Sequence, residues 1–307
     1  MKKNKMMKNK INIFFLLLIV VSCKEDVNKG DTDIEVNTKT SVSHKSKDNL
    51  NISFLLDLSD RISPEKYPNS TMEYYRRDIA YIKSVSEAFD MHLRGKKVRA
   101  INDKMQLYFD PEPSNQNINT ISNSLKYSLD KKNVTLSVLD DIKESYASKP
   151  QKIYDLAIAD NKYVGSDTWR FFKSKVNDYC IEENYRNILV VLTDGYIYHK
   201  NTKIKEDNLT TYLTPSFIRE VKLNNKNWES KIEDQQFGFI PAVHDLSNLE
   251  ILVLGINPDN KNPYEEDLIK KYWSDWFDAM KVRHYQIKTS ALPSNLDKII
   301  KNFILNN

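Results

Sequence analysis

Three short polar turns combine carboxylate and hydroxyl side chains in this chain. They are DLS at 57–59, within the stretch DLSDRIS, then GSDT at 165–168 and TDG at 193–195. Oxygen atoms of this kind are the ligands that Mg²⁺ takes in proteins. A carboxylate such as Asp57 can also serve as a general acid or base, and any one of these turns can simply cap a helix.

Buried strands must position two of these turns. The runs 52–56, 187–192 and 249–256 are continuous and apolar, as in strands that are covered on both faces. Asp57 follows the first run and Asp194 follows the second. Strand-like runs alternate with helical patterns, which predicts an α/β three-layer sandwich: a mainly parallel sheet with helices on both faces. Ligands bind such sheets at the carboxyl ends of the strands, which is where both aspartates fall.

Apolar spacing places the remaining elements. Spacings of three and four predict helices at about 72–93, 118–129, 134–146, 153–159, 169–180, 264–280 and 293–304. Extended segments are expected at 98–101, 105–109 and 282–287. Ser70-Thr71 is a candidate cap for the first helix, and Gly95 is a plausible stop for it. Residues 196–248 are polar and irregular, and we interpret them as a long insertion of the kind that is often functional or mobile.

The order of the three turns resembles the von Willebrand factor type A domain. That family places a D-x-S-x-S loop after its first strand, a Thr before a helix and an Asp in a T-D-G or S-D-G turn after its fourth strand. Asp57 and Ser59 match the first loop, Ser166 takes the Thr position and Asp194 matches the last turn. The resemblance covers roughly 50–305. It implies a metal-ion-dependent adhesion site that holds Mg²⁺ or Mn²⁺ and takes an acidic residue from a protein partner.

One residue departs from this pattern. The family requires a hydroxyl where this chain has Arg61, and arginine has no acceptor with which to bind a cation. In one alternative Arg61 turns away and leaves the metal to the four matching residues and water, an outcome that pairing with Asp60 would favour. In the other its guanidinium lies between Asp57 and Asp194 and replaces the ion. We count Asp60 and Arg61, together with Thr168 and Thr193 beside the ligand positions, as residues that modify the site.

Other functional classes leave weaker marks. A metal-dependent hydrolase is the enzyme alternative, but Ser59 stands where a D-x-D phosphatase would have its second acid. The chain has no G-x-S-x-G elbow and no G-x-x-x-x-G-K loop. Its five histidines are scattered without ligand spacing. The sequence therefore favours a binding protein over an enzyme, with a metal-free scaffold in an envelope complex as the other alternative.

The first residues have the pattern of an export signal. A basic start is followed by the apolar run 11–21 and the tetrad VVSC at 20–23. The run is too short to span a bilayer. The tetrad resembles the lipobox of bacterial lipoproteins, which implies a signal peptide at 1–22 and a lipid on Cys23. Residues 23–50 would then form a flexible tether to a domain at 51–307, held at the cell envelope, with the outer membrane or cell surface favoured.

The net charge excludes one class of partner. The chain carries 46 Lys and Arg against 42 Asp and Glu, a formal charge of +4. Five of the lysines and none of the acids lie in the signal, so 41 bases face 42 acids after cleavage. A mature charge of −1 gives no reason to expect a nucleic-acid surface. The expected partner is a protein, and the membrane is contacted through the lipid anchor only.

Overall fold

The computed structural model describes residues 49–163 and 165–306. The predicted signal peptide, Cys23 and nearly all of the tether lie outside the described residues. The domain begins one residue earlier than predicted, because Leu50 is already part of the first strand. Within the described residues, no helix is both long and apolar enough to cross a membrane.

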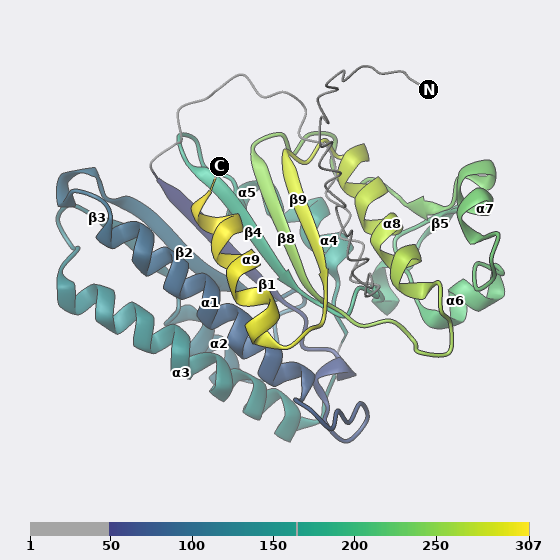
Figure 1. Ribbon diagram of the computed structural model, residues 1–307, viewed down its shortest axis with the longest axis horizontal. Helices are drawn as coiled ribbons and strands as arrows, with labels where there is room; N and C mark the ends of the chain where they lie inside the picture. Colours follow the sequence, from purple (N-terminus) through teal and green to yellow (C-terminus); the bar gives the residue numbers. More distant parts are fainter. Residues whose placement is uncertain (1–48, 164, 307) are drawn as a thin grey trace, which may run out of the picture. The chain divides into compact units, whose positions relative to one another are not determined.

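The centre of the domain is a six-stranded sheet (Figure 1). Its spatial order is β3 (Tyr127–Asp130), β2 (Asn102–Tyr108), β1 (Leu50–Leu56), β4 (Arg186–Leu192), β8 (Leu249–Ile256) and β9 (His284–Thr289). All neighbours are parallel except β2 and β3. The chain runs outward from β1 in one direction through β2 and in the other through β4. The strand order therefore reverses between β1 and β4, which is where open α/β sheets bind ligands.

Helices cover both faces of the sheet, as the alternation of side chains requires. Ile52, Phe54 and Leu56 join one core cluster with the helices α1, α3 and α9, whereas Leu55 joins a second cluster with α4, α5 and α8. The helices are α1 (Tyr74–Arg94), α2 (Gln116–Asn123), α3 (Leu136–Asp160), α4 (Thr168–Ser174), α5 (Val176–Cys180), α8 (Glu265–Ala279) and α9 (Pro293–Leu305). The predicted fold class is confirmed.

Both clusters close within the described domain. Their buried members run from Leu50 to Ile304, so the described residues form a continuous core. We therefore expect the domain to fold by itself. Cys180 is fully buried in the second cluster as a free thiol, as its helical pattern indicates.

The segment 196–248 is more ordered than its composition predicts. It contains η3 (Lys200–Thr202), the small sheet β5 (Lys205–Glu206), β6 (Leu209–Thr210) and β7 (Gly238–Phe239), and the helices α6 (Pro215–Glu220) and α7 (Trp228–Gln235). Phe217 and Phe239 are buried in the second core cluster. Trp169 and Trp276 both donate a hydrogen bond to the carbonyl of Ile240. The expectation of irregular chain was wrong, because widely spaced apolar residues of the segment join the second core cluster, where Phe239 contacts Tyr272 and Trp276 of α8.

Several predicted boundaries also differ. The first helix begins at Tyr74 with Glu73 as its cap, not at Ser70-Thr71, but it ends before Gly95 as expected. Residues 98–100 form the 3-10 helix η2, and 127–130 form a strand rather than the end of a helix. The two helices predicted over 134–159 are one, α3, which continues through Pro150.

Candidate functional site

The register of the two central strands places the first and third polar turns together. Leu56 of β1 pairs with Leu192 of β4, so Asp57 and Thr193 are the next residues along adjacent strands. The amide of Asp57 donates to the carbonyl of Leu192 at 3.0 Å. The hydroxyl of Thr193 donates to Asp57 Oδ2 at 3.2 Å. The carboxyl ends of β1 and β4 therefore form one polar edge.

A pocket of about 690 Å³ opens at this edge. Asp57, Ser59, Ser166 and Asp194 all line it, and Asp60 and Arg61 line it too. We call it the Asp57–Asp194 pocket. Tyrosines and prolines form much of its remaining wall, namely Tyr67, Pro68, Tyr74, Tyr196, Tyr198, Pro215 and Pro258. The four residues that the sequence predicts as metal ligands thus come from three separate loops into one cavity.

Asp57 is held from both sides. Its Oδ1 accepts a hydrogen bond from the amide of Ser59 at 2.8 Å, which folds the DLS turn back on its own carboxylate. Its Oδ2 accepts from Thr193 and lies 3.5 Å from Arg61 Nε. The side chain is only 3 % exposed. Asp57 is therefore fixed in direction, as a residue at the floor of a binding site must be.

Arg61 turns inward and is 95 % buried. Its Nη2 donates to Asp78 Oδ2 at 2.6 Å and to the carbonyl of Leu192 at 2.9 Å. The hydroxyl of Tyr154 donates to the same oxygen of Asp78 at 3.0 Å. Burial by itself lowers the pKa of Arg61, but the charges of Asp78 and Asp57 outweigh it and raise the pKa above its ordinary value. The arginine is a permanent cation beneath the pocket.

The carboxylates of this edge outnumber the arginine. Asp57, Asp78 and Asp194 all act on Arg61 by their charge, and Arg61 is the one cation buried among them in the described domain. Asp194 Oδ1 accepts from the amide of Tyr196 at 3.0 Å, and no ion pair to Asp194 is found within the described residues. Burial and the nearby charge of Asp57 raise the pKa of Asp194 to about 7, although Arg61 opposes the shift. The pocket floor therefore places the carboxyl groups of Asp57 and Asp194 beside a single buried arginine.

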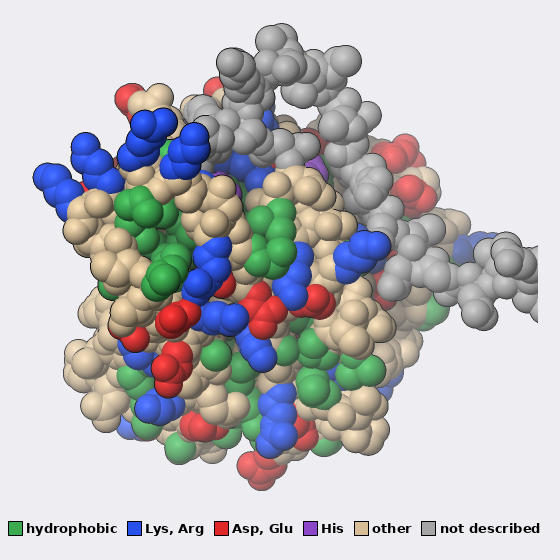
Figure 2. All heavy atoms as spheres, turned by 60° about the vertical axis from the view of Figure 1, so that its left-hand side comes forward, with side chains coloured by type: hydrophobic (Ala, Val, Ile, Leu, Met, Phe, Trp, Pro, Cys, Tyr) green, Lys and Arg blue, Asp and Glu red, His purple; other side chains and the backbone are tan. Residues whose placement is uncertain are grey.

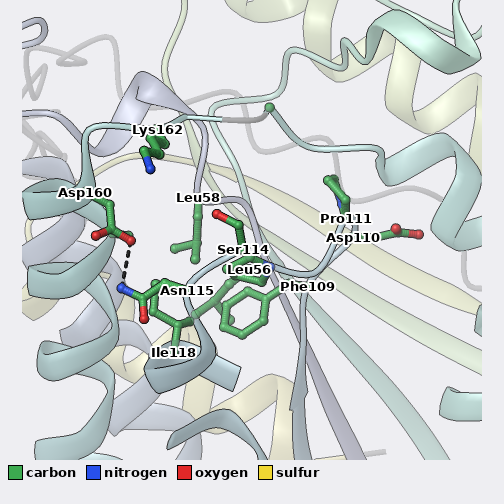
Figure 3. Close-up of a pocket in the computed structure, with 13 residues that line it drawn as sticks. Leu56, Leu58, Phe109, Asp110, Pro111, Ser114, Asn115, Ile118, Asp160 and Lys162 are labelled. Carbon is green, nitrogen blue, oxygen red and sulfur yellow. Dashed lines mark hydrogen bonds between the residues drawn. The ribbon is translucent and has the colours of Figure 1, made fainter. Parts of the chain in front are cut away.

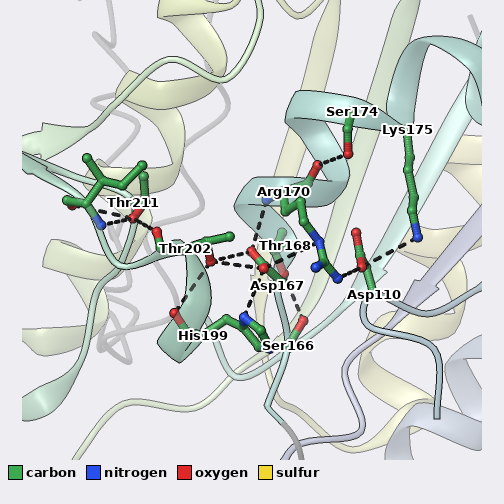
Figure 4. Close-up of polar contacts among 11 residues, drawn as sticks. Asp110, Ser166, Asp167, Thr168, Arg170, Ser174, Lys175, His199, Thr202 and Thr211 are labelled. Atoms are coloured by element: carbon green, nitrogen blue, oxygen red, sulfur yellow. Dashed lines mark hydrogen bonds and ion pairs between the residues drawn. The ribbon is translucent and has the colours of Figure 1, made fainter. Parts of the chain in front are cut away.

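The loop that carries Ser166 is held by a second polar cluster (Figure 4). Asp167 is 99 % buried; it caps α4 by accepting from the amide of Arg170 at 3.1 Å. The hydroxyl of Thr202 donates to both carboxylate oxygens of Asp167 at 2.9 Å, and His199 Nδ1 lies 3.1 Å from one of them. Arg170 also pairs with the buried Asp110. These contacts fix the 165–168 turn to the start of the insertion.

The four residues predicted to modify the site lie in different surroundings. Thr168 shares a 3.0 Å hydrogen bond with the hydroxyl of Ser166, and Thr193 bonds Asp57, so both support the pocket from behind. Asp60 does not pair with Arg61; it pairs with Lys66 at 3.0 Å on the surface. Arg61 does approach Asp57 as in the second sequence alternative, but its main partner is Asp78 rather than Asp194.

Asp78 and Tyr154 are the residues that sequence reasoning missed. Asp78 is buried on α1, three residues after Tyr75 and four before Ile82, so it lies in the apolar stripe of that helix. A carboxylate at such a position needs a buried partner, and this is the signal that could have revealed it. Tyr154 carried no comparable signal, because a tyrosine on an apolar face is ordinary core.

A second cavity lies near the end of β1 (Figure 3). Leu56, Leu58, Phe109 and Ile118 form its apolar side, and Asn115 donates to Asp160 Oδ2 at 2.7 Å at its rim. Its volume is about 30 Å³, room for about one water molecule. It is a packing defect rather than a ligand site, so the Asp57–Asp194 pocket remains the candidate site.

The donor atoms of the pocket partly fit a hard cation. The hydroxyl of Ser59 and the Oδ2 of Asp194 have no hydrogen-bond partner in the described part of the chain, and both belong to pocket-lining residues. The described part of the chain contains no group of three or more His, Cys, Asp or Glu side chains that could hold a metal. A cation here would therefore depend on hydroxyls and two carboxylates, a set that suits Mg²⁺ or Mn²⁺ with retained waters.

No family model matches this chain, and no curated protein matches it either. Solved structures with a similar fold include an aerotolerance-related membrane protein from Bacteroides fragilis, with 11% identity and a TM-score of 0.36 over 83% of this chain and 98% of that one. The pilus adhesin SpaC from Lactobacillus rhamnosus GG has 12% identity and a TM-score of 0.39, over 83% of this chain and 29% of that one.

A variant of the PilB minor pilin from Streptococcus sanguinis has 12% identity and a TM-score of 0.41, over 83% of this chain and 60% of that one. This chain thus spans less than two thirds of both pilus proteins. The fold assignment rests on the chain's own strand order, and the site rests on its own loops.

Proposed function

We propose that this protein is a binding protein whose domain, similar to the von Willebrand factor type A domain, captures a protein partner at the Asp57–Asp194 pocket. The observation that carries the proposal is the convergence of Asp57, Ser59, Ser166 and Asp194 from three loops on one cavity. This cavity lies at the reversal of strand order, where α/β sheets bind ligands. Tyrosines along its wall are of a type enriched at protein interfaces.

A divalent cation would complete this site. Asp57, Ser59, Ser166 and Asp194 would hold Mg²⁺ or Mn²⁺, together with water. The metal would supply an open coordination position for an acidic side chain of the partner. The excess of carboxylates over arginine supports this arrangement, because uncompensated buried charge is costly.

The position of Arg61 favours a second candidate, a metal-free scaffold. The guanidinium is buried and lies 3.5 Å from Asp57, so it already supplies part of the neutralising charge. In that case the pocket would bind its partner without an ion. Substitution at Arg61 separates the two candidates, because serine restores the hydroxyl of the D-x-S-x-S loop.

Titration calorimetry with Mg²⁺ and Mn²⁺ tests the metal. We expect heat and thermal stabilisation with the domain 24–307, and neither with Asp194→Asn. The exposed Asp207→Asn is the matched control, since it removes an equal charge from the insertion. No heat with the unaltered domain, together with heat after Arg61→Ser, would establish the scaffold candidate and refute the metal.

A metal-dependent hydrolase has less support, because Ser59 stands where a D-x-D phosphatase would have its second acid. A panel of phosphatase and esterase substrates tests it. Activity that disappears in Asp57→Asn would reverse this ranking.

We further propose that the domain is lipid-anchored at the bacterial cell envelope through Cys23. The support is the basic start, the apolar run and the VVSC tetrad. Cys23→Ser should release the protein from the membrane fraction of expressing cells, and mass spectrometry should find the acyl mass only on the unaltered chain. Membrane retention of Cys23→Ser without that mass would refute the anchor.

A further inference from the structure

A second surface gathers unpaired cations at the opposite end of the sheet. Lys97 caps η2 and Arg99 lies within it, and Lys131 and Lys132 follow β3 directly. η2 contacts β3, so the two pairs lie at one corner, which we call the basic corner. All four side chains are exposed. The basic corner is at the amino ends of β1 and β2, away from the Asp57–Asp194 pocket at the carboxyl ends.

The four cations are not neutralised by their surroundings. None of them forms an ion pair or a side-chain hydrogen bond within the described residues. Of the acids nearby, Asp130 accepts backbone amides of the turn, and Asp140 pairs with Arg94. Because the mature chain has a net charge close to zero, this corner is a local excess and not a consequence of an overall basic protein.

Exposed apolar side chains accompany these charges. Val98 lies between Lys97 and Arg99 and is 58 % exposed; Leu136 begins α3 just after the lysine pair and is 71 % exposed. These two are the most exposed large hydrophobic residues of the described domain. Figure 2, which brings this side of the molecule forward, shows Lys and Arg side chains gathered at its upper left with hydrophobic side chains below them.

The chain enters the domain beside the same corner. Lys96 Nζ donates to the side chain of Asn49 at 3.1 Å, and the amide of Leu50 donates to the buried Asp103 at 2.7 Å. Asn49 is the first described residue. Twenty-five residues separate it from the predicted lipid on Cys23. A lipid anchor would therefore hold this corner, rather than the pocket, nearest to the bilayer.

We propose that the basic corner lies against the anionic headgroups of the membrane, with Val98 and Leu136 inserted at the interface. Cations flanking exposed apolar side chains are the pattern of peripheral membrane contact. Each Lys or Arg near an anionic surface adds to the attraction. Such docking directs the Asp57–Asp194 pocket away from the bilayer, where a partner can reach it. The inference is independent of whether the pocket binds a metal.

Vesicle sedimentation tests the proposal with the unlipidated domain 24–307. Vesicles of phosphatidylcholine are compared with vesicles that contain phosphatidylglycerol. We expect binding to the anionic vesicles alone, and a loss of about tenfold or more in Lys97→Gln/Arg99→Gln/Lys131→Gln/Lys132→Gln. The matched control neutralises four exposed lysines elsewhere, in Lys162→Gln/Lys173→Gln/Lys205→Gln/Lys226→Gln, and should retain binding. Val98→Ser/Leu136→Ser should weaken binding about threefold.

Three outcomes would overturn the proposal. The first is equal binding to neutral and anionic vesicles. The second is equal loss in the corner variant and in the control, which would indicate general charge attraction. The third is binding of soluble polyphosphate at least as tight as that of the vesicles, which would assign the corner to an anionic polymer. All substituted side chains are exposed, so unchanged melting temperatures are expected and show that each variant is folded.

Discussion

Two buried arginines lie at opposite edges of the same sheet and are satisfied to different degrees. Arg186 begins β4 at the amino edge, where its Nε and Nη2 donate to both oxygens of Glu250 on β8 at 2.7–3.1 Å. Its remaining donors reach the carbonyls of Phe303 and Ile304 at 2.7 and 2.6 Å. One carboxylate pairs with one guanidinium in a bidentate arrangement, and main-chain carbonyl oxygens accept the remaining hydrogen bonds of the arginine.

At the carboxyl edge the pairing is incomplete. Arg61 donates hydrogen bonds only from Nη2, to Asp78 and to the carbonyl of Leu192, and its buried Nε has no hydrogen-bond partner. Three carboxylates act on it, and Asp194 lines the pocket with no ion pair among the described residues. The difference teaches that buried charge by itself does not mark a site. A completed pair such as Arg186–Glu250 joins strands and a helix, whereas the surplus of one sign beside a cavity leaves capacity for a ligand.

The largest effect is expected at the completed pair. Arg186→Met leaves the carboxylate of Glu250 buried without its main partner, and the free energy of unfolding should fall by about 3–5 kcal/mol. Urea unfolding followed by circular dichroism measures it. The double variant Arg186→Met/Glu250→Leu removes both charges and should recover most of the loss. If the single variant lost less than about 1 kcal/mol, the contrast between the two edges would disappear.

Acid should act on the same pair. Burial alone raises the pKa of Glu250, but the nearby His284, at 3.8 Å, and the hydrogen bonds and charge of Arg186 outweigh it and lower the pKa from 4.5 to about 2. Because the folded pKa is the lower one, this stabilisation is complete above about pH 4.5 and is lost as the pH falls towards 2. The shift corresponds to about 3 kcal/mol at most.

Unfolding curves between pH 6 and pH 2 measure that loss. Glu250→Gln should be less stable at neutral pH and should show a flatter decline with acid than the unaltered domain. Parallel declines in the two proteins would show that other carboxylates dominate acid unfolding.

How far the sequence predicts the molecule depends on the range of the interactions involved. The strands around 52–56, 187–192 and 249–256 can be predicted because a continuous apolar run in the sequence indicates a strand that is buried on both faces. The shared edge of Asp57 and Asp194 followed from strand polarity alone. The insertion was not predicted as ordered, because buried residues such as Phe239 contact a helix that comes later in the sequence, α8.

The candidate site shows the same limit. Asp57, Ser59, Ser166 and Asp194 follow strands or precede a helix, so their meeting could be predicted from their positions on the elements. The partner of Arg61 could not. Asp78 comes from the face of α1 that packs on the sheet, and its 2.6 Å contact depends on how that helix is placed. A carboxylate in the apolar stripe of a helix indicates that it has a buried partner, but it does not indicate which residue that partner is.

At the carboxyl edge, Arg61→Met should have a smaller effect than Arg186→Met. It removes two hydrogen bonds and one close charge pair, and we expect a loss of about 2–3 kcal/mol in the free energy of unfolding. Three carboxylates then remain without an arginine. If the pocket takes a divalent cation, 10 mM Mg²⁺ should restore part of this loss, while Arg186→Met with the same salt should recover nothing. Equal responses of the two variants to Mg²⁺ would mean that the salt acts generally and not at the pocket.

The smallest effect on stability, and the sharpest contrast, is expected for Asp194→Asn. Glu250→Gln breaks a satisfied pair and should destabilise the domain, whereas Asp194 forms no ion pair within the described residues, and repulsion by Asp57 outweighs its attraction to Arg61. Asparagine keeps an acceptor for the amide of Tyr196 while removing the charge, so stability should stay within about 1 kcal/mol of the unaltered domain or rise slightly. The same substitution should abolish Mg²⁺ heat and partner capture. Loss of partner capture without loss of stability would show that the charge of Asp194 serves binding. A loss of several kcal/mol in the free energy of unfolding would instead show that Asp194 has the structural role that Glu250 has at the other edge.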